Sequence, residues 1–180
     1  MSFFVQAADE GVGSVTNDYD VCFREKHYSE KSLAFLEKAG IDIEKHKHQG
    51  IKQADFFQYL SASPLTRMPG IQWISFQGLY DFAYIIKGIT KSCLPQNMED
   101  FMYQMRAFFP FTFDVKKMMK QIPYIYNGQG LKTVSNTLRV SCDDAFHQAG
   151  YDSLITYACC IQLFQMGIVT MGVEGLPDSY

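Results

Sequence analysis

The chain has 180 residues, which is enough for one domain with a substantial hydrophobic core. Hydrophobic residues make up 47% and charged residues 19%, a balance that excludes a disordered chain and a solvated helical rod. The formal net charge of −3 argues against a generally basic nucleic-acid-binding protein. Any nucleic acid must therefore be bound by a local patch, or through metal ions held on carboxylates.

The cysteines and the first residues bear on the cellular compartment. Five cysteines form no C-x-x-C pair and no regular spacing, which favours reduced thiols over a disulfide framework. The amino-terminal residues turn polar by Gln6 and Asp9 without a basic segment, so we expect no signal peptide. No run approaches the roughly 20 apolar residues of a membrane-spanning helix. We expect an intracellular protein without a membrane partner.

The first part of the chain predicts helices and then a strand. Residues 1–28 are weakly patterned, and helical periodicity begins at Ser29, which can cap a helix that Gly40 ends. A second helix is predicted over 53–60. The run 71–76 (IQWISF) is rich in aromatic and β-branched residues, which indicates a buried strand.

Helices and a second strand follow Gly78. The last helix is apolar on nearly every face, which is typical of a buried helix. Alternating strands and helices imply an α/β fold with a parallel-rich sheet, whose functional residues lie at strand ends. The elements predicted here are a helix from Asp81, a helix over 97–108, a strand over 111–115, a helix over 131–138 and a helix over 150–166.

Two short arrangements could carry chemistry. SFQGLYDF places Asp81 at a strand-to-helix turn, and HQAGYDS places His147 five residues before Asp152 at the start of the last helix. Carboxylates suit Mg²⁺ or Mn²⁺, and two such ions about 4 Å apart can activate water for phosphodiester cleavage. A histidine beside them can remove the proton of the water. Alternatively, both acids could stabilise helix starts and the histidine could be structural.

Other features also have both a functional and a purely structural interpretation. The lysines could meet phosphates or form a solvated face, and the two histidines of His46-Lys47-His48 are too few for a metal site and predict an exposed loop. The aromatic run could stack on bases, although it is predicted to pack in the core, and the adjacent cysteines are predicted to fill the core. The features concerned are Lys116, Lys117, Lys120, Lys132, the segment 46–48, the run 108–111 and the pair Cys159-Cys160.

From Gly70 to about Phe164 the chain resembles the Caf-one-type (Pop-two-like) deadenylases, the nuclease subunit of the Ccr–Not mRNA decay complex. Residues 29–60 match this family more loosely. The combination of an HQAG-x-DS element with a preceding YDF-x-Y-x-IK element is specific to the family. The matching pieces are WISFQGLYDFAYIIK, MRAFFPFTFDVKKMMK and HQAGYDSLITYACC, with GLKTVSNTL after a glycine-containing loop.

The resemblance implies a fold and an activity. The family belongs to the DEDD exonucleases, whose ribonuclease H-like α/β fold has a mixed sheet flanked by helices. Its members remove poly(A) from the 3′ end of mRNA in the 3′-to-5′ direction, using two divalent cations (Mg²⁺ or Mn²⁺). By motif, Asp81 and Asp152 resemble the metal ligands and His147 the general base. The implied partners are the poly(A) RNA 3′ end, a Not-type scaffold and a second Ccr-type nuclease, in the cytoplasm and nucleus.

One family motif has no counterpart in this sequence. The family places an Asp-x-Glu pair on its first strand, within Asp-Thr-Glu-Phe-Pro-Gly, and residues 1–70 contain no such sequence. Asp42-Ile43-Glu44 has the spacing, but it follows a helix stop and lacks Phe-Pro-Gly, so we expect it not to bind metal. We transfer no metal role to Asp114 either.

The missing motif leads us to expect an amino-terminally truncated or remodelled fold with an incomplete metal site. The predicted divisions are a remnant of the amino-terminal strands over 1–28, a nuclease domain over 29–166 and a tail over 167–180. The expected function is a poly(A)-specific 3′–5′ exoribonuclease. The alternative is a catalytically inactive relative that acts as a protein-interaction subunit or regulator.

Overall fold

The computed structural model describes residues 34–35, 37–38, 40–66, 70–122, 124, 130–140 and 149–173. Residues 34–35 and 37–38 are helical, and Gly40 ends this segment with a φ of 85°, in the left-handed region that favours glycine. Ser29, the predicted cap of that helix, lies outside the described residues. Of the described residues, none belongs to a helix with the length and apolar character needed to cross a membrane.

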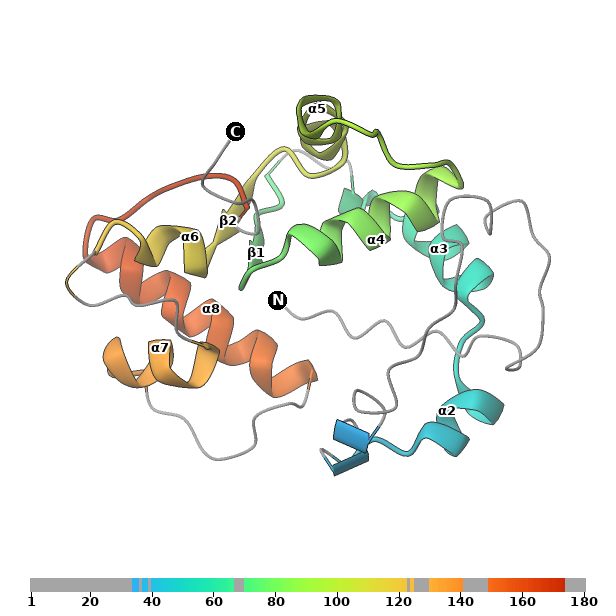
Figure 1. The fold of residues 1–180 in the computed structure, drawn as a ribbon, viewed down its shortest axis with the longest axis horizontal. Helices are drawn as coiled ribbons and strands as arrows, with labels where there is room; N and C mark the ends of the chain where they lie inside the picture. Colours follow the sequence, from blue (N-terminus) through green and yellow to red (C-terminus); the bar gives the residue numbers. More distant parts are fainter. Residues whose placement is uncertain are drawn as a thin grey trace.

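The described elements follow the predicted order from residue 53 onward (Figure 1). Both strands are only three residues long, shorter than their apolar runs suggested. The elements are α2 (Ile43–Gln49), α3 (Gln53–Ala62), the 3₁₀ turn η2 (Pro64–Thr66), β1 (Trp73–Ser75), α4 (Leu79–Thr90), α5 (Met98–Phe108), β2 (Thr112–Asp114), α6 (Val115–Met119), α7 (Leu131–Thr137) and α8 (Ala149–Gln165).

The two strands pair in parallel, as the α/β prediction required. Their register places Ser75 opposite Asp114, so both strands end at the same edge of the sheet. On the other side of β2, the Gly172 backbone N–H donates to the Thr112 carbonyl at 2.8 Å. Residues after α8 therefore return to the sheet, and Val173 packs in the core there with 3% of its surface exposed.

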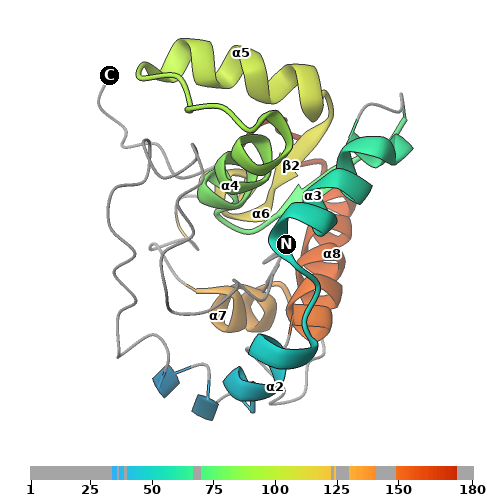
Figure 2. The same ribbon diagram turned by 90° about the vertical axis from the view of Figure 1, so that its right-hand side faces the viewer.

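Strand alternation divides the core into two clusters, one on each face of the sheet. Trp73 packs with α3, α4 and α5, and its ring meets the fully buried Phe109 edge-on at a centroid distance of 5.0 Å. Ile74 and Phe113 face the opposite way, toward the cluster that α6, α7 and α8 form. Figure 2 shows α4 and α5 on one side of the strands and α8 on the other.

Helix α8 is less covered than its sequence predicted. Ile155, Cys159 and Leu163 are buried against β1, α6 and α7, as expected. Leu154 and Tyr157 are 61% and 54% exposed in the described part of the chain, which corrects the expectation of a helix buried on nearly every face. The apolar pattern reports the composition of this helix, but only one side meets packing partners there.

The cysteines and the aromatic run match the sequence predictions in part. Cys159 and Cys160 are buried, which confirms their core role. Cys93 is disulfide-bonded, which corrects the expectation of reduced thiols for this residue. Phe109 confirms the core prediction for the aromatic run, but Phe111 is 41% exposed.

Candidate active site at the end of the sheet

The turn between β1 and α4 places an acid beside the end of the sheet. β1 ends at Ser75, and Gln77 adopts a φ of 59°, a left-handed conformation that is uncommon for residues other than glycine. At Gly78 an added Cβ would lie 2.5 Å from the Ser75 Cβ, so only glycine fits this close approach. α4 then begins at Leu79 and carries Asp81 in its first turn.

Asp114 joins this turn to the one that follows β2. Its side chain is fully buried and caps α6. Both carboxylate oxygens are engaged, so the residue links the two strand ends and has little capacity left for a metal ion. The donors are Ser75 Oγ at 2.8 Å and Gly78 N at 2.8 Å to Oδ2, and Gln77 N at 2.9 Å, Lys116 N at 3.0 Å and Lys117 N at 3.4 Å to Oδ1.

Asp81 differs in its surroundings. It is half-buried, burial raises the pKa of its carboxyl above the usual 3.8, and the nearby charge of Asp114 raises it further. Asp81 does not cap α4, because the N-cap is Gly78 and no side chain of the described residues caps this helix. The Gly78 N–H donates to Asp114. A partly desolvated carboxylate beside a second carboxylate is a favourable place for a cation.

Asp152 is buried in the first turn of α8, with 7% of its surface exposed. Its backbone carbonyl accepts from Thr156 Oγ1 at 2.7 Å, and the helix packs against β1 and α6. A buried carboxylate is stable only when charge or hydrogen-bonding partners compensate its lost hydration. Asp152 therefore has the burial expected of a functional acid, while its role as a metal ligand stays a prediction.

His147 lies outside the described residues, so its predicted role as general base stays a prediction. Among the residues that the structure describes, no group of three or more His, Cys, Asp or Glu side chains could hold a metal ion. The oxygen donors of Asp81 and Asp152 fit Mg²⁺ or Mn²⁺ in kind, and the described segments supply two such acids for this purpose.

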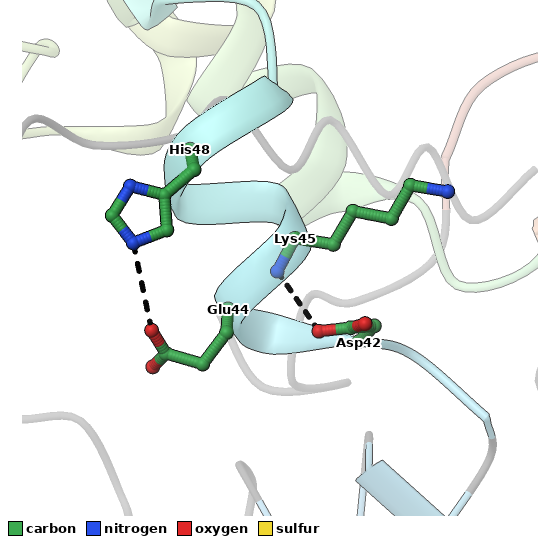
Figure 3. Close-up of polar contacts among 4 residues, drawn as sticks. All are labelled: Asp42, Glu44, Lys45 and His48. Atoms are coloured by element: carbon green, nitrogen blue, oxygen red, sulfur yellow. Dashed lines mark hydrogen bonds and ion pairs between the residues drawn. The ribbon is translucent and has the colours of Figure 1, made fainter.

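The Asp42-Ile43-Glu44 sequence is part of a helix start (Figure 3). Asp42 Oδ1 accepts from the Lys45 backbone N–H at 2.8 Å, and Glu44 lies 3.8 Å from His48 Nε2 across one turn. Both acidic side chains interact with residues of α2, which agrees with the expectation that the pair is not the metal motif. His48 is exposed as predicted, but it belongs to a helix and not to a loop.

A model of the CAF1 family ribonucleases matches residues 72–161, which is half of the chain. The chain belongs to this family. The match includes Asp81, Asp114 and Asp152, so it covers both turns at the sheet edge and the start of α8. The resemblance expected from the sequence is thereby confirmed.

Two curated relatives of this CAF1 family member show the extent of the similarity. Poly(A) ribonuclease pop2 of Schizosaccharomyces pombe is 37% identical over 129 residues, covering 72% of this chain and 38% of that protein. CCR4-NOT transcription complex subunit 7 of Caenorhabditis elegans is 33% identical over 163 residues, covering 86% and 52%. The chain thus spans about half or less of the length of these relatives.

Solved structures confirm the fold. S. pombe Pop2p in its Mg²⁺- and Mn²⁺-bound form is 34% identical with a TM-score of 0.70, covering 78% of this chain and 55% of that one. CAF1 co-crystallised with the yeast NOT1 MIF4G domain is 26% identical with a TM-score of 0.66, covering 85% and 59%. The predicted ribonuclease H-like α/β fold is therefore confirmed.

Proposed function

We propose that this chain is a poly(A)-specific 3′–5′ exoribonuclease of a Ccr–Not-type complex. The observation that supports this most is the half-buried Asp81, placed at the end of the sheet with a raised pKa and next to the fully engaged Asp114. Membership in the CAF1 family supplies the reaction class.

Asp81 and Asp152 would hold the divalent cations, and His147 would take a proton from the attacking water. When bound, such ions activate water and stabilise the leaving oxygen of a phosphodiester. Asp114 fixes the Gln77–Gly78 turn through its hydrogen bonds and thereby orients the first turn of α4. A turn fixed in this way would hold the backbone of Asp81 in place for a cation, which is the preorganisation that a site of this kind needs.

The proposed partners follow from the relatives. Pop2p binds Mg²⁺ and Mn²⁺, which supports these ions as the cofactors here. CAF1 was crystallised with the NOT1 MIF4G domain, which supports a Not-type scaffold as partner. A second Ccr-type nuclease, the poly(A) 3′ end as substrate, and a cytoplasmic and nuclear location complete the proposal by family resemblance.

The test is a gel assay of the purified chain on 5′-labelled oligoadenylate with Mg²⁺ or Mn²⁺. The proposal predicts stepwise shortening from the 3′ end that disappears in Asp152→Ala, with circular dichroism showing that the variant is folded. The variant also controls for contaminating nucleases. A folded wild-type chain that leaves the RNA intact would overturn the enzymatic proposal and favour an interaction subunit or regulator.

A further inference from the structure

Lys116 reaches across the sheet edge to the neighbouring turn. Its Nζ donates to Gln77 Oε1 at 2.6 Å and lies 5.9 Å from the centroid of the Phe76 ring. The hydrogen bond to Gln77 joins residues 39 positions apart in sequence, one on each turn at the end of the sheet. The ammonium group is therefore held over the β1–α4 turn, within the same local structure that carries Asp81.

Asp114 fixes the backbone at both residues of the Lys116–Gln77 contact. The backbone N–H groups of Gln77 and Lys116 both donate to Asp114 Oδ1, at 2.9 Å and 3.0 Å. The left-handed conformation of Gln77 directs this residue out of the strand path. A side chain anchored in this way loses less conformational freedom on binding a ligand than an ordinary surface lysine does.

The charge of Lys116 is not neutralised by its contacts. The Gln77 side chain offers a neutral amide oxygen, and no Asp or Glu in the described part of the chain forms an ion pair with Lys116. An ammonium group has three donors, and the bond to Gln77 uses one of them. Two donors and a full positive charge remain for an anion.

We propose that Lys116 is a substrate-binding residue that contacts a phosphate of the RNA strand beside Asp81, with Gln77 as its positioning partner. This inference rests on the proposed function and adds a cationic contact that does not depend on metal ions. The net charge of the chain is −3, so the binding of a polyanion such as RNA needs local positive charge, which Lys116 supplies. A purely structural bridge would instead affect stability and leave RNA binding unchanged.

The test measures binding of fluorescently labelled oligoadenylate by anisotropy, in EDTA so that the RNA is not shortened, between 50 and 300 mM KCl. Removing one phosphate contact is expected to reduce the slope of log affinity against log salt by about 0.7, which corresponds to roughly a fivefold weaker affinity at 100 mM. Lys116→Met should show both changes. Lys116→Gln, which loses the charge but can still donate to Gln77, should behave in the same way, and Lys116→Arg should bind like wild type.

The matched control is Lys91→Met. Lys91 is the C-cap of α4, about 15 Å along the helix from Asp81. Its replacement by Met removes the same positive charge as Lys116→Met. It should leave slope and affinity unchanged. Equal slopes for Lys116→Gln and wild type would overturn the inference, as would a wild type that shortens RNA in Mg²⁺ but does not bind it in EDTA. A wild type that neither binds nor shortens RNA would overturn the proposed function as well.

Discussion

The β1–α4 and β2–α6 turns lie at the same edge of the sheet, and each places an aspartate there. Asp114 accepts five hydrogen bonds and is fully buried, so its charge is compensated by donors from both turns. Asp81 is half-buried, and burial together with the charge of Asp114 raises its pKa. The neighbours of an acid, more than its place after a strand, therefore separate a structural carboxylate from one suited to a cation.

The largest effect should come from removing the structural acid. Asp114→Ala leaves buried donors of both turns without an acceptor, so we expect the free energy of unfolding to fall by about 3 to 5 kcal/mol. Urea denaturation followed by circular dichroism measures this change. A loss below about 1 kcal/mol would mean that the carboxylate does not hold the turns together.

The close approach at Gly78 can be tested separately. In Gly78→Ala the new Cβ would meet Ser75 Cβ at 2.5 Å and Oγ at 2.6 Å, so the β1–α4 turn must shift. Overpacking of this kind costs about 1 to 3 kcal/mol in denaturation experiments. Gly150→Ala is the matched control, because no atom of the described residues lies within 4 Å of its added Cβ and alanine favours the α8 helix by about 0.5 to 1 kcal/mol. Equal effects of the two variants would contradict the assigned turn geometry.

Asp81→Asn should change the free energy of unfolding less than Asp114→Ala or Gly78→Ala does, and this change should depend on pH. The folded-state pKa of Asp81 lies above 3.8, so the folded protein holds this proton more tightly than the unfolded chain does. The stability that this proton provides is present below pH 3.8 and is lost as the pH rises through the folded-state pKa. The urea midpoint of wild type minus that of Asp81→Asn should therefore decrease between pH 3 and pH 7. An increase in this difference over the same range would contradict the direction of the pKa shift that burial causes.

The smallest effect is expected at the sequence that imitates the family's first acidic motif. Asp42→Ala removes an exposed cap of the short helix α2, which should cost about 0.5 kcal/mol, near the low end for helix caps. Shortening of oligoadenylate should continue at the wild-type rate. Loss of shortening in a folded Asp42→Ala chain would show that the segment takes part in the site after all.

Local patterns predicted much of the fold. Apolar periodicity located α3, α4, α5, α7 and α8 because each buries one side, and Asn97 acts as the N-cap of α5, where the sequence placed the start of that helix. The predicted strands were too long, since pairing and not apolar content limits β1 and β2 to three residues. The exposure of Leu154 could not be predicted, because hydrophobicity does not report which partners are available.

The candidate site was predictable to a smaller extent. The strand-to-helix turn and the family motif both indicated Asp81, and its position in α4 agrees with them. The role of Asp114 as a link between the two turns escaped sequence reasoning because three of its five donors, Ser75, Gln77 and Gly78, lie 36 to 39 residues earlier. The only local signal was an aspartate two residues before Lys116, in the spacing of a helix cap. The Lys116–Gln77 contact is equally non-local.

The most direct test of the difference between the two aspartates is a Mn²⁺ titration followed by electron paramagnetic resonance of the free ion. Wild type and Asp81→Asn are compared, with circular dichroism showing that both are folded. We expect saturable binding by the wild type and at least a tenfold weaker affinity in Asp81→Asn, because the variant loses a charged oxygen ligand. Equal affinities would contradict the assignment of Asp81 as the acid that receives the cation at this end of the sheet.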